Sequence, residues 1–147
     1  MEGGITENKK AYFDYEIFER IEAGIVLTGH ETKSIRSGHI NLAGAHAIIR
    51  GSEAFILNMQ IPSFQPENAP EEYDPARTRK LLLTKKEILY ISGKIKGGLT
   101  LIPLKVYSKR RLLKIELGLA RGRKKHDKRE IIKKRETERE IRKREGL

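Results

Sequence analysis

The sequence predicts a mainly β protein: a small antiparallel β-barrel with two or three short flanking helices, followed by a basic C-terminal tail. Short runs of β-branched and aromatic residues recur at hairpin spacing, which is typical of small barrels. Only a few segments carry the caps and periodicity of helices. Residues 121–147 hold many charges and few apolar side chains, too few to build a core. We therefore expect one domain over residues 1–120 and a tail over residues 121–147.

The N-terminal segment is expected to be extended chain. Residues 1–7 have the character of a loose terminus. Apolar and polar side chains alternate over Ala11–Glu16, which predicts a half-buried strand. Extended chain should continue over Ile17–Leu27, and Ala23-Gly24 is the place where we expect a bend or bulge.

Two short helices are predicted from their terminal residues. Residues 28–31, Thr-Gly-His-Glu, have the spacing of a capping box, so a helix is expected at about residues 30–37 with Gly38 as its stop. Residues 84–87, Thr-Lys-Lys-Glu, form a second such box and open a helix that closes at Gly97-Gly98.

Four further runs favour strands in two hairpins. Ala47–Ile49 and Glu53–Ile61 flank Gly51-Ser52, a two-residue turn signal. Leu99–Tyr107 and Leu112–Ala120 are the second pair. With the N-terminal strands, these runs give the five or six strands of a small barrel.

The charge of the chain is uneven. It has 31 Lys and Arg against 20 Asp and Glu, a net charge of +11. Residues 121–147 contain 13 basic and six acidic residues, a net +7, and residues 1–120 supply the remaining +4. Such an excess favours a polyanionic partner, a nucleic acid or an anionic membrane. The alternative is a solvated tail that only raises solubility.

The residue types exclude several function classes. Without cysteine the chain has no disulfides, thiolate zinc sites or cysteine nucleophile. Its apolar runs are too short to span a bilayer, and no signal peptide is visible, so we expect a soluble, cytoplasmic protein. The spacing of His30, His39 and His46 fits no helical metal motif. Glu71, Glu72 and Asp74 lie in the proline-rich loop Pro62–Pro75, where carboxylates are usually solvated. We therefore expect no metal, no cofactor and no catalytic residue.

Two basic segments are candidate RNA-binding sites. The segment Arg77–Lys86 holds five cations beside three leucines, and its alternative is a core strand with solvated ends. The segment Gly122–Arg129 begins with a glycine that can act as a hinge, and its alternative is an ordinary disordered tail. The later isoleucines of the tail form no apolar stripe, so we expect at most a nascent helix that orders on a polyanion.

Several strings give the chain a resemblance to a known family. They are Asn8-Lys9-Lys10-Ala11, Glu22-Ala23-Gly24, Gly29-x-Glu31-x-Lys33-Ser34-x-Arg36-x-Gly38, Asp74-Pro75-x-Arg77-x-Arg79-Lys80-Leu81-Leu82-Leu83, Pro103-Leu104-Lys105 and Gly122-x-Lys124-x-x-Asp127-Lys128-Arg129. From about Asn8 to Arg144 the chain resembles the SsrA-binding protein (small protein B) family of bacteria, the protein partners of transfer-messenger RNA. The resemblance implies a closed barrel of oligonucleotide-binding type and a role in trans-translation, the rescue of stalled ribosomes.

The resemblance also implies two RNA sites and a hinge. The barrel would bind the tRNA-like domain of transfer-messenger RNA, and the tail would enter the decoding centre and mRNA channel, contacting small-subunit ribosomal RNA. Matched positions in the barrel are Asn8, Lys9, Lys10, Glu22, Arg36, Lys80 and Leu82. Matched positions in the tail are Lys124, His126, Asp127, Lys128 and Arg129, with Gly122 as the hinge. Thr84 and Lys109-Arg110-Arg111 depart from the family pattern.

The expected protein is thus a monomeric, non-enzymatic adaptor in a 1:1 complex with its RNA, away from membranes. The first alternative is a basic structural protein of the ribosome, which would also be small and tailed. The second is an enzyme acting on RNA, which is disfavoured because no pair of acid and base residues emerges from the sequence.

Overall fold

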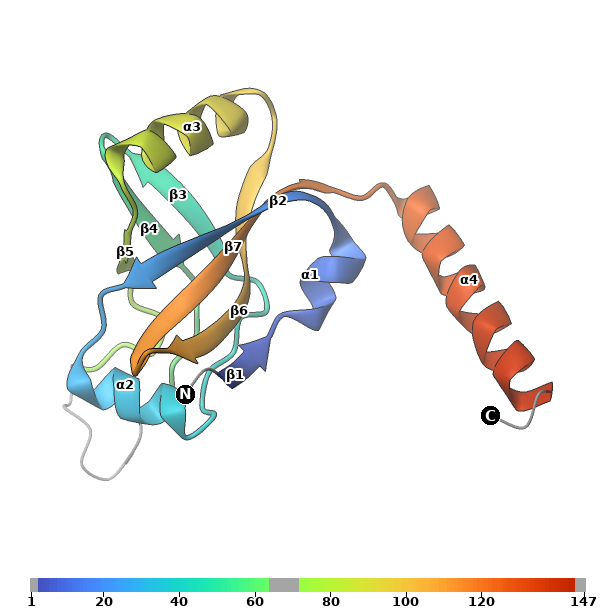
Figure 1. Cartoon of the computed structure of the whole chain (residues 1–147), viewed down its shortest axis with the longest axis horizontal. Helices are drawn as coiled ribbons and strands as arrows, with labels where there is room; N and C mark the ends of the chain where they lie inside the picture. Colours follow the sequence, from blue (N-terminus) through green and yellow to red (C-terminus); the bar gives the residue numbers. More distant parts are fainter. Residues whose placement is uncertain (1–2, 64–71, 145–147) are drawn as a thin grey trace.

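A seven-stranded antiparallel sheet accompanied by four helices makes up residues 3–63 and 72–144, the part of the chain that the computed structural model describes (Figure 1). The strands are β1 (Gly3–Glu7), β2 (Tyr15–Ile25), β3 (His46–Arg50), β4 (Glu53–Leu57), β5 (Arg79–Leu82), β6 (Thr100–Lys109) and β7 (Leu112–Gly122). The helices are α1 (Lys9–Asp14), α2 (Gly29–Arg36), α3 (Lys85–Lys96) and α4 (Lys125–Arg144). The prediction of a mainly β chain with antiparallel pairing is confirmed.

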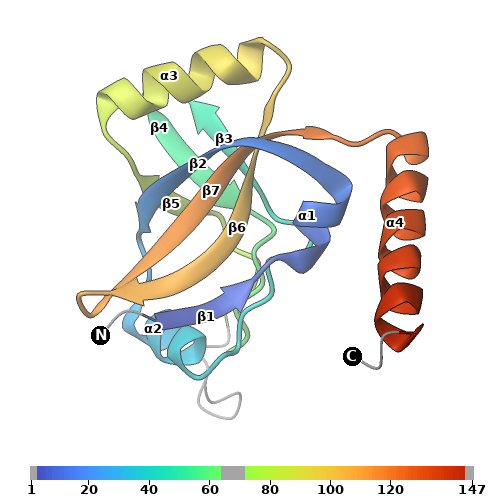
Figure 2. The same cartoon turned by 45° about the vertical axis from the view of Figure 1, so that its right-hand side comes forward.

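The strands are joined into a ring. Their order is β1-β6-β3-β4-β5-β2-β7, and a further pairing of β6 with β7 closes the six strands from β6 to β7 into a ring. Strand β1 is added at the side of β6. Figure 2 shows the long strands β2, β7 and β6 crossing in front of β3, β4 and β5, with α3 at one end of the ring and α2 at the other. We call this body, residues 3–63 and 72–122, the ring.

The two predicted hairpins are present. Strands β3 and β4 meet through Gly51-Ser52, where Gly51 has the positive φ, 62°, that such a turn requires. Strands β6 and β7 meet through Arg110 and Arg111, whose φ values are 50° and 66°. Bulky residues rarely adopt this conformation, so the second turn is a strained one. Strand β4 is shorter than predicted because Asn58, with a φ of 61°, bends the chain away.

Both predicted capping boxes are formed. At α2 the Thr28 hydroxyl accepts a hydrogen bond from the backbone of Glu31, whose carboxylate accepts one from the backbone of Thr28. Thr84 and Glu87 do the same at the start of α3. After α2 the chain turns at Gly38, whose φ is 83°. These local signals were sufficient because each lies within one turn of helix.

The strand predicted over Ala11–Glu16 is wrong at its start, where the chain forms α1. The Asn8 side-chain oxygen caps this helix by accepting a hydrogen bond from Ala11 N at 3.3 Å. Ala11 then packs into a small apolar cluster under the helix with Ile102, Leu104 and Ala120. Alternation over six residues could not reveal this, because the partners of Ala11 are distant in sequence.

Two other N-terminal expectations are corrected. Residues 3–7 are not loose: they form β1, and the side chain of Ile5 packs against the main core. The bulge in β2 lies between Ile17 and Glu19 rather than at Ala23-Gly24. Gly24 instead allows a close approach, since a Cβ there would lie 3.1 Å from the Cβ of Leu82 on β5.

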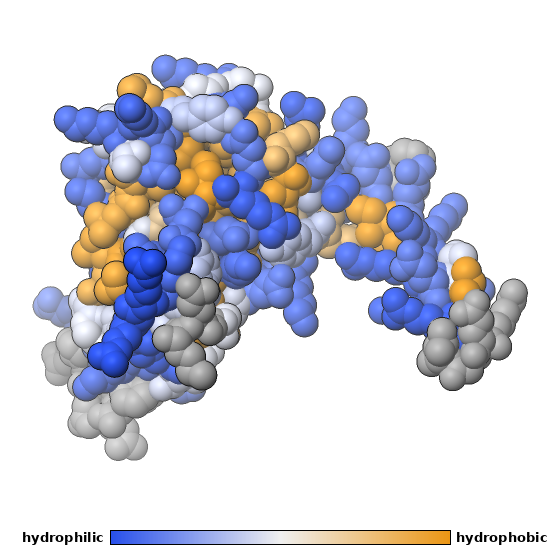
Figure 3. All heavy atoms as spheres, in the orientation of Figure 1, coloured by the Kyte–Doolittle hydropathy of each residue, from blue (hydrophilic) through white to orange (hydrophobic). Residues whose placement is uncertain are grey.

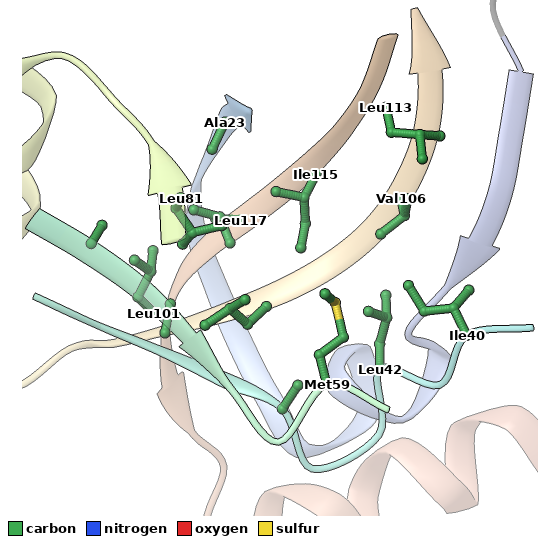
Figure 4. Packing of buried hydrophobic residues seen from close by; sticks show 14 of the residues in the cluster. Ala23, Ile40, Leu42, Met59, Leu81, Leu101, Val106, Leu113, Ile115 and Leu117 are labelled. Atoms are coloured by element: carbon green, nitrogen blue, oxygen red, sulfur yellow. The ribbon is translucent and has the colours of Figure 1, made fainter. Parts of the chain in front are cut away.

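The main hydrophobic core fills the inside of the ring. Figure 4 shows side chains from opposite strands, such as Leu81, Leu101 and Ile115, converging there with Met59. Their exposed fraction is 2% or less. Strands on both sides of the ring supply this core. Because the core is closely packed, the strands and the positions of their outward side chains are fixed.

The C-terminal segment forms α4, which extends away from the ring (Figure 1). The prediction that this segment is at most a nascent helix before it binds RNA stays a prediction. Within the described ranges, no helix is both long and apolar enough to cross a membrane.

Candidate nucleic-acid interface

One face of the ring gathers charged side chains from four neighbouring strands. We call it the outer face, and its members are Glu22, Lys80, Leu82, Lys105, Tyr107, Lys109, Lys114 and Glu116. The register places these residues in adjacent cross-strand positions: Gly24 lies between Leu82 and Lys114, and Glu22 pairs with Glu116. Lys114 and Glu116 in turn pair with Tyr107 and Lys105. The outer face is therefore continuous across β5, β2, β7 and β6.

Glu22 is held in place at the centre of the outer face. It accepts hydrogen bonds from the Tyr107 hydroxyl and, at 3.4 Å, from the Lys109 ammonium. The bond from Tyr107 is the main reason why the pKa of Glu22 is lowered; burial opposes it, and Lys109 and Lys114 add to it. About 40% of the side chain is exposed. Glu22 is thus an ionised, oriented acceptor that can take further hydrogen bonds from a ligand.

An apolar patch lies beside this acceptor. The Leu82 side chain is 54% exposed, on a strand that lies between two others. A groove of about 550 Å³ runs past Leu82 and Lys80 to the start of α3. Lys80 also lies 3.8 Å from Glu53. Of the sequence-predicted barrel residues, Glu22, Lys80 and Leu82 are brought onto the same face. Figure 3, which has the orientation of Figure 1, shows hydrophobic and hydrophilic residues side by side on the surface of the ring that faces the viewer.

Arg36 occupies the end of α2 and supports the turn between β6 and β7. Its guanidinium donates to the carbonyl of Arg111 at 2.7 Å and to the hydroxyl of Ser108 at 3.4 Å. The side chain is exposed, and a guanidinium has five N–H donors, so further acceptors can bind. Arg36 therefore stands at the edge of the outer face and holds the strained turn of that edge.

Asn8 differs from its two neighbours. It is 8% exposed, and its amide nitrogen donates to the carbonyls of Pro103 at 3.0 Å and Leu42 at 3.4 Å. Because its side chain is used inside the fold, Asn8 fixes the start of α1. Lys9 and Lys10 follow on the first turn and are exposed.

A buried ion cluster removes two cations from the segment Arg77–Lys86. Arg79 is fully buried and donates through Nε to a Glu31 carboxylate oxygen at 2.7 Å, and to the carbonyls of Met59, Pro75 and Arg77. Arg77 donates to both oxygens of the same carboxylate. Of the five cations of this candidate segment, Arg79 is therefore inaccessible to RNA, and Arg77, which is partly exposed, is held by the same carboxylate.

The carboxylate of Glu31 is strongly stabilised in its ionised form. Burial acts to raise its pKa, but the hydrogen bonds from Arg77, the Thr28 backbone and Arg79 outweigh burial and lower the pKa to about 2. The sequence indicated Glu31 only as the partner in a capping box. Its second role could not be found there, because Arg77 and Arg79 lie more than 40 residues away.

The predicted tail residues begin beside α1. The backbone N–H of Arg123 donates to the carbonyl of Asp14 at 2.8 Å, and the Lys128 ammonium lies 3.1 Å from the Asp14 carboxylate. Lys128 and Arg135 both lie over the Phe13 ring, 5.9 and 5.7 Å from its centroid. One predicted RNA contact, Lys128, is therefore engaged with the body of the protein in this structure.

The other tail positions are more open. Lys124, Asp127 and Arg129 are exposed, while the side chain of His126 lies outside the described part of the chain. Gly122 ends β7, and a Cβ there would meet no atom within 4 Å. The hinge role of Gly122 stays a prediction.

Residues considered for metal binding or acid–base chemistry take part in separate contacts where the structure describes them. His30 shares a hydrogen bond of 2.7 Å with the Ser63 hydroxyl and meets the Tyr73 ring edge to face. The Asp74 carboxylate accepts from the backbone of Ala76 at 2.9 Å. Glu71 lies outside the described residues. Among the described residues no group of three His, Cys, Asp or Glu could hold a metal ion.

Sequence reasoning missed Tyr107, Lys105 and Lys114 as members of the outer face. The alternation along the predicted strands does carry the signal, since Lys105 and Tyr107 flank the buried Val106. The register between β6 and β7 was needed to place these residues next to Glu22, because a shift lies between Pro103 and Lys105.

Comparison with known proteins supplies independent information. Residues 5–145 match the family model described as "SmpB protein". The SsrA-binding protein of Gloeothece citriformis (strain PCC 7424) is 50% identical over 138 residues, covering 93% of this chain and 89% of the relative. That of Mycoplasma mycoides subsp. mycoides SC is 52% identical over 136 residues, covering 92% of each. A solved chain described as "tmRNA-SmpB: a journey to the center of the bacterial ribosome" has a TM-score of 0.69 and 43% identity, covering 82% of this chain and 85% of that one.

Proposed function

The chain belongs to the SmpB protein family, and from that premise we propose how its ring and its tail divide the work of an RNA-binding adaptor. As a member of this family it acts with transfer-messenger RNA on ribosomes in trans-translation. What remains to be assigned is the role of each part and of each residue in this chain.

The ring is a closed barrel of the oligonucleotide-binding type. The pairing of β6 with β7, which closes six of the strands into a ring, supports a closed barrel. Members of this architecture bind nucleic acid on strand surfaces, although the fold alone does not establish function.

The outer face binds the tRNA-like domain of transfer-messenger RNA. The observation that carries this assignment is the joint placement of Glu22, Leu82 and Lys80 on one continuous surface, although they lie up to 60 residues apart. Folded RNA offers three kinds of group to such a face. Lysine ammonium groups suit its phosphates, an oriented carboxylate suits amino or 2′-hydroxyl donors, and an exposed leucine suits base or ribose surfaces.

Residues at the edge of the outer face extend this contact. Lys9 and Lys10 present charge from α1, which Asn8 anchors. Arg36 presents its remaining donors while holding the turn at Arg111. In this assignment Asn8 acts through the position of α1 and does not itself touch RNA.

The tail binds ribosomal RNA in the decoding centre and the mRNA channel. Lys124, Lys128 and Arg129 supply charge for phosphates, His126 supplies a ring for stacking, and Asp127 stands in the first turn of α4. For the tail to reach that site, the contact between Lys128 and Asp14 must break and the chain must rotate at Gly122. The protein works as a monomer in a 1:1 complex with its RNA, in the cytoplasm.

Sequencing of the RNA that copurifies with the protein tests this proposal. The expected result is one dominant RNA species with a tRNA-like end. The protein itself should be present on ribosomes only in substoichiometric amounts. The alternative, a basic structural protein of the ribosome, would give one copy on every translating ribosome after a high-salt wash. That second result would refute the adaptor role.

A further inference from the structure

A second groove lies at the end of the ring that α3 covers. It has a volume of about 490 Å³, and residues that line it include Phe18 and Glu19 of β2, Gly93 and Lys94 of α3, and Arg121 of β7. We call it the α3 groove. Its volume falls in the range of roughly 300–1,000 Å³ that is usual for small-molecule and nucleotide sites.

The α3 groove is separate from the outer face. Glu22 pairs with Glu116, whose side chain points out of the ring, whereas Glu19 pairs with Leu119, whose side chain points into the core. Residues paired across strands share a side of the sheet. Helix α3 lies at one end of the ring (Figure 2), so the groove lined by Gly93 and Lys94 opens at that end. Arg121, which also lines it, comes one residue before Gly122, the last residue of β7.

Aromatic rings and cations are combined in this groove. Phe18 is 48% exposed, and the guanidinium carbon of Arg121 lies 5.5 Å from the centre of its ring. On α3, the Lys94 ammonium lies 5.3 Å from the Tyr90 ring, and the Tyr90 hydroxyl donates to the Glu19 carboxylate. Both cations and the carboxylate are thus held by aromatic partners, which reduces their freedom before any ligand arrives.

Gly93 borders open space in the groove. It lies in the interior of α3, where glycine is less favourable than alanine. No close packing requires it, because a Cβ at this position would meet no atom within 4 Å. A large side chain placed here would therefore enter the groove that Phe18 and Lys94 also line.

We propose that the α3 groove binds one unstacked nucleotide of single-stranded RNA. The base stacks on Phe18, the phosphate lies between Arg121 and Lys94, and the Glu19 carboxylate accepts from an exocyclic amino group of the base. Stacking on an exposed aromatic ring and charge for the backbone are the two elements by which proteins bind single strands. An acidic peptide would satisfy the cations but would leave Phe18 exposed and place its charge against Glu19.

The absence of tryptophan from the chain provides a local test. In the full-length Phe18→Trp variant, the only tryptophan reports stacking at this groove, since a stacked base quenches its fluorescence. We expect hexacytidylate to quench it at a concentration at least several times lower than hexauridylate, because cytosine carries an amino donor for Glu19 where uracil carries a carbonyl.

Two matched variants control this test. Leu89 lies on α3 with 74% exposure and does not line the groove, so Leu89→Trp should show little quenching. Adding Gly93→Leu to Phe18→Trp should fill the groove without disturbing the core and raise the half-saturating concentration about tenfold. Equal quenching in Leu89→Trp, or no effect of Gly93→Leu, overturns the proposal. Displacement of the RNA by hexaglutamate at comparable concentration would overturn it in favour of an acidic peptide.

The same reporter distinguishes the source of the nucleotide. Quenching by transfer-messenger RNA or by isolated small ribosomal subunits supports the proposal and identifies which RNA fills the groove, and quenching by neither overturns it. Because the outer face is separate, Phe18→Ser should leave affinity for the tRNA-like domain unchanged. Failure of this inference would therefore leave the proposed function intact.

Discussion

The ring and the tail of this protein obtain their structure in opposite ways. In the ring, strands distant in sequence enclose side chains that are almost fully buried, such as Ile56, Leu104 and Ile115. In α4 the larger apolar side chains remain open, with Ile132 and Ile141 at 44% and 46% exposure. Helix α4 contacts α1, where Lys128 pairs with Asp14 and Arg135 lies over the Phe13 ring.

In the proposed function, this difference lets one small chain serve two RNA partners. A ring with a buried core presents charges and an apolar patch at set distances, which suits a folded RNA with a defined shape. A charged helix without a core can leave one site and adapt to another, with most of its binding energy supplied by phosphates. The following experiments test this contrast, from the largest expected effect to the smallest.

Removal of residues 122–147 should produce the largest functional change. Affinity for transfer-messenger RNA should stay within about threefold, because the outer face lies in the ring and the lost charges contribute mainly sequence-independent attraction. Peptide tagging in a reconstituted translation reaction should be abolished. Binding by filter assay and tagging by gel analysis measure the two effects. A collapse of RNA affinity in the truncated chain would contradict the division between ring and tail.

Glu31→Gln should greatly destabilise the ring. It leaves Arg79 as a buried charge without its carboxylate, which typically costs about 3–5 kcal/mol of unfolding free energy. Urea unfolding at pH 7 measures this loss. Glu53→Gln is the matched control, since its exposed pair with Lys80 should contribute at most about 1 kcal/mol. Similar losses of unfolding free energy in both variants would show that the buried ion cluster stabilises the fold no more than an exposed pair does.

The pH dependence of stability should follow the same carboxyl group. The pKa of Glu31 is about 2 in the folded protein, below its ordinary value of 4.5, so the unfolded chain takes up the proton first as the pH falls. Its contribution, roughly 3 kcal/mol, is therefore complete above about pH 4.5 and is lost towards pH 2. The stability difference between the wild type and Glu31→Gln should narrow over this range. If the stability difference between the wild type and Glu31→Gln were the same at pH 7 and pH 3, the ionisation of Glu31 would be excluded as the origin of this pH dependence.

Lys80→Ala should weaken binding of the tRNA-like domain by about three- to tenfold and lower the slope of log affinity against log salt by roughly 0.7–0.9. Arg50→Ala, an exposed cation on β3 outside the outer face, is the control and should change neither value appreciably. Anisotropy titrations at several salt concentrations provide the measurement. An unchanged slope for Lys80→Ala would remove that side chain from the phosphate contacts.

Asp14→Asn should have the smallest effect, a release of the tail from the ring. The pair between Asp14 and Lys128 is partly exposed, and such pairs contribute about 0–1 kcal/mol. We expect amide hydrogen exchange at the start of α4 to rise by up to about fivefold. Glu136→Gln, further along α4, serves as the control. Unchanged exchange in Asp14→Asn would mean that the Phe13 ring and the bond from Arg123 N–H to the Asp14 carbonyl hold the tail without this ion pair.

Local signals in the sequence predicted some elements correctly and others not. The helices that begin after Thr28 and Thr84 were predicted, because capping boxes act within one turn. Helix α1 and strand β1 were missed, because Ala11 and Ile5 are stabilised by partners on β6, β7 and in the core. The same holds for the candidate site. The family resemblance pointed to Lys80 and Glu22, whereas Tyr107, which donates to Glu22, was recognised only from the structure.

The sequence alone determined the division into a basic tail and a less charged body, the two capped helices, the hairpin signals and the family resemblance. The tertiary structure decided which charges are available to a ligand. Arg77 and Arg79 donate to Glu31, and the Asn8 amide donates to the carbonyl of Pro103. Lys80 is exposed, although all four residues belong to the strings that carry the family resemblance. The physical reason is that the cost of burying a charge depends on the partners that the fold brings to it, and those partners are distant in sequence.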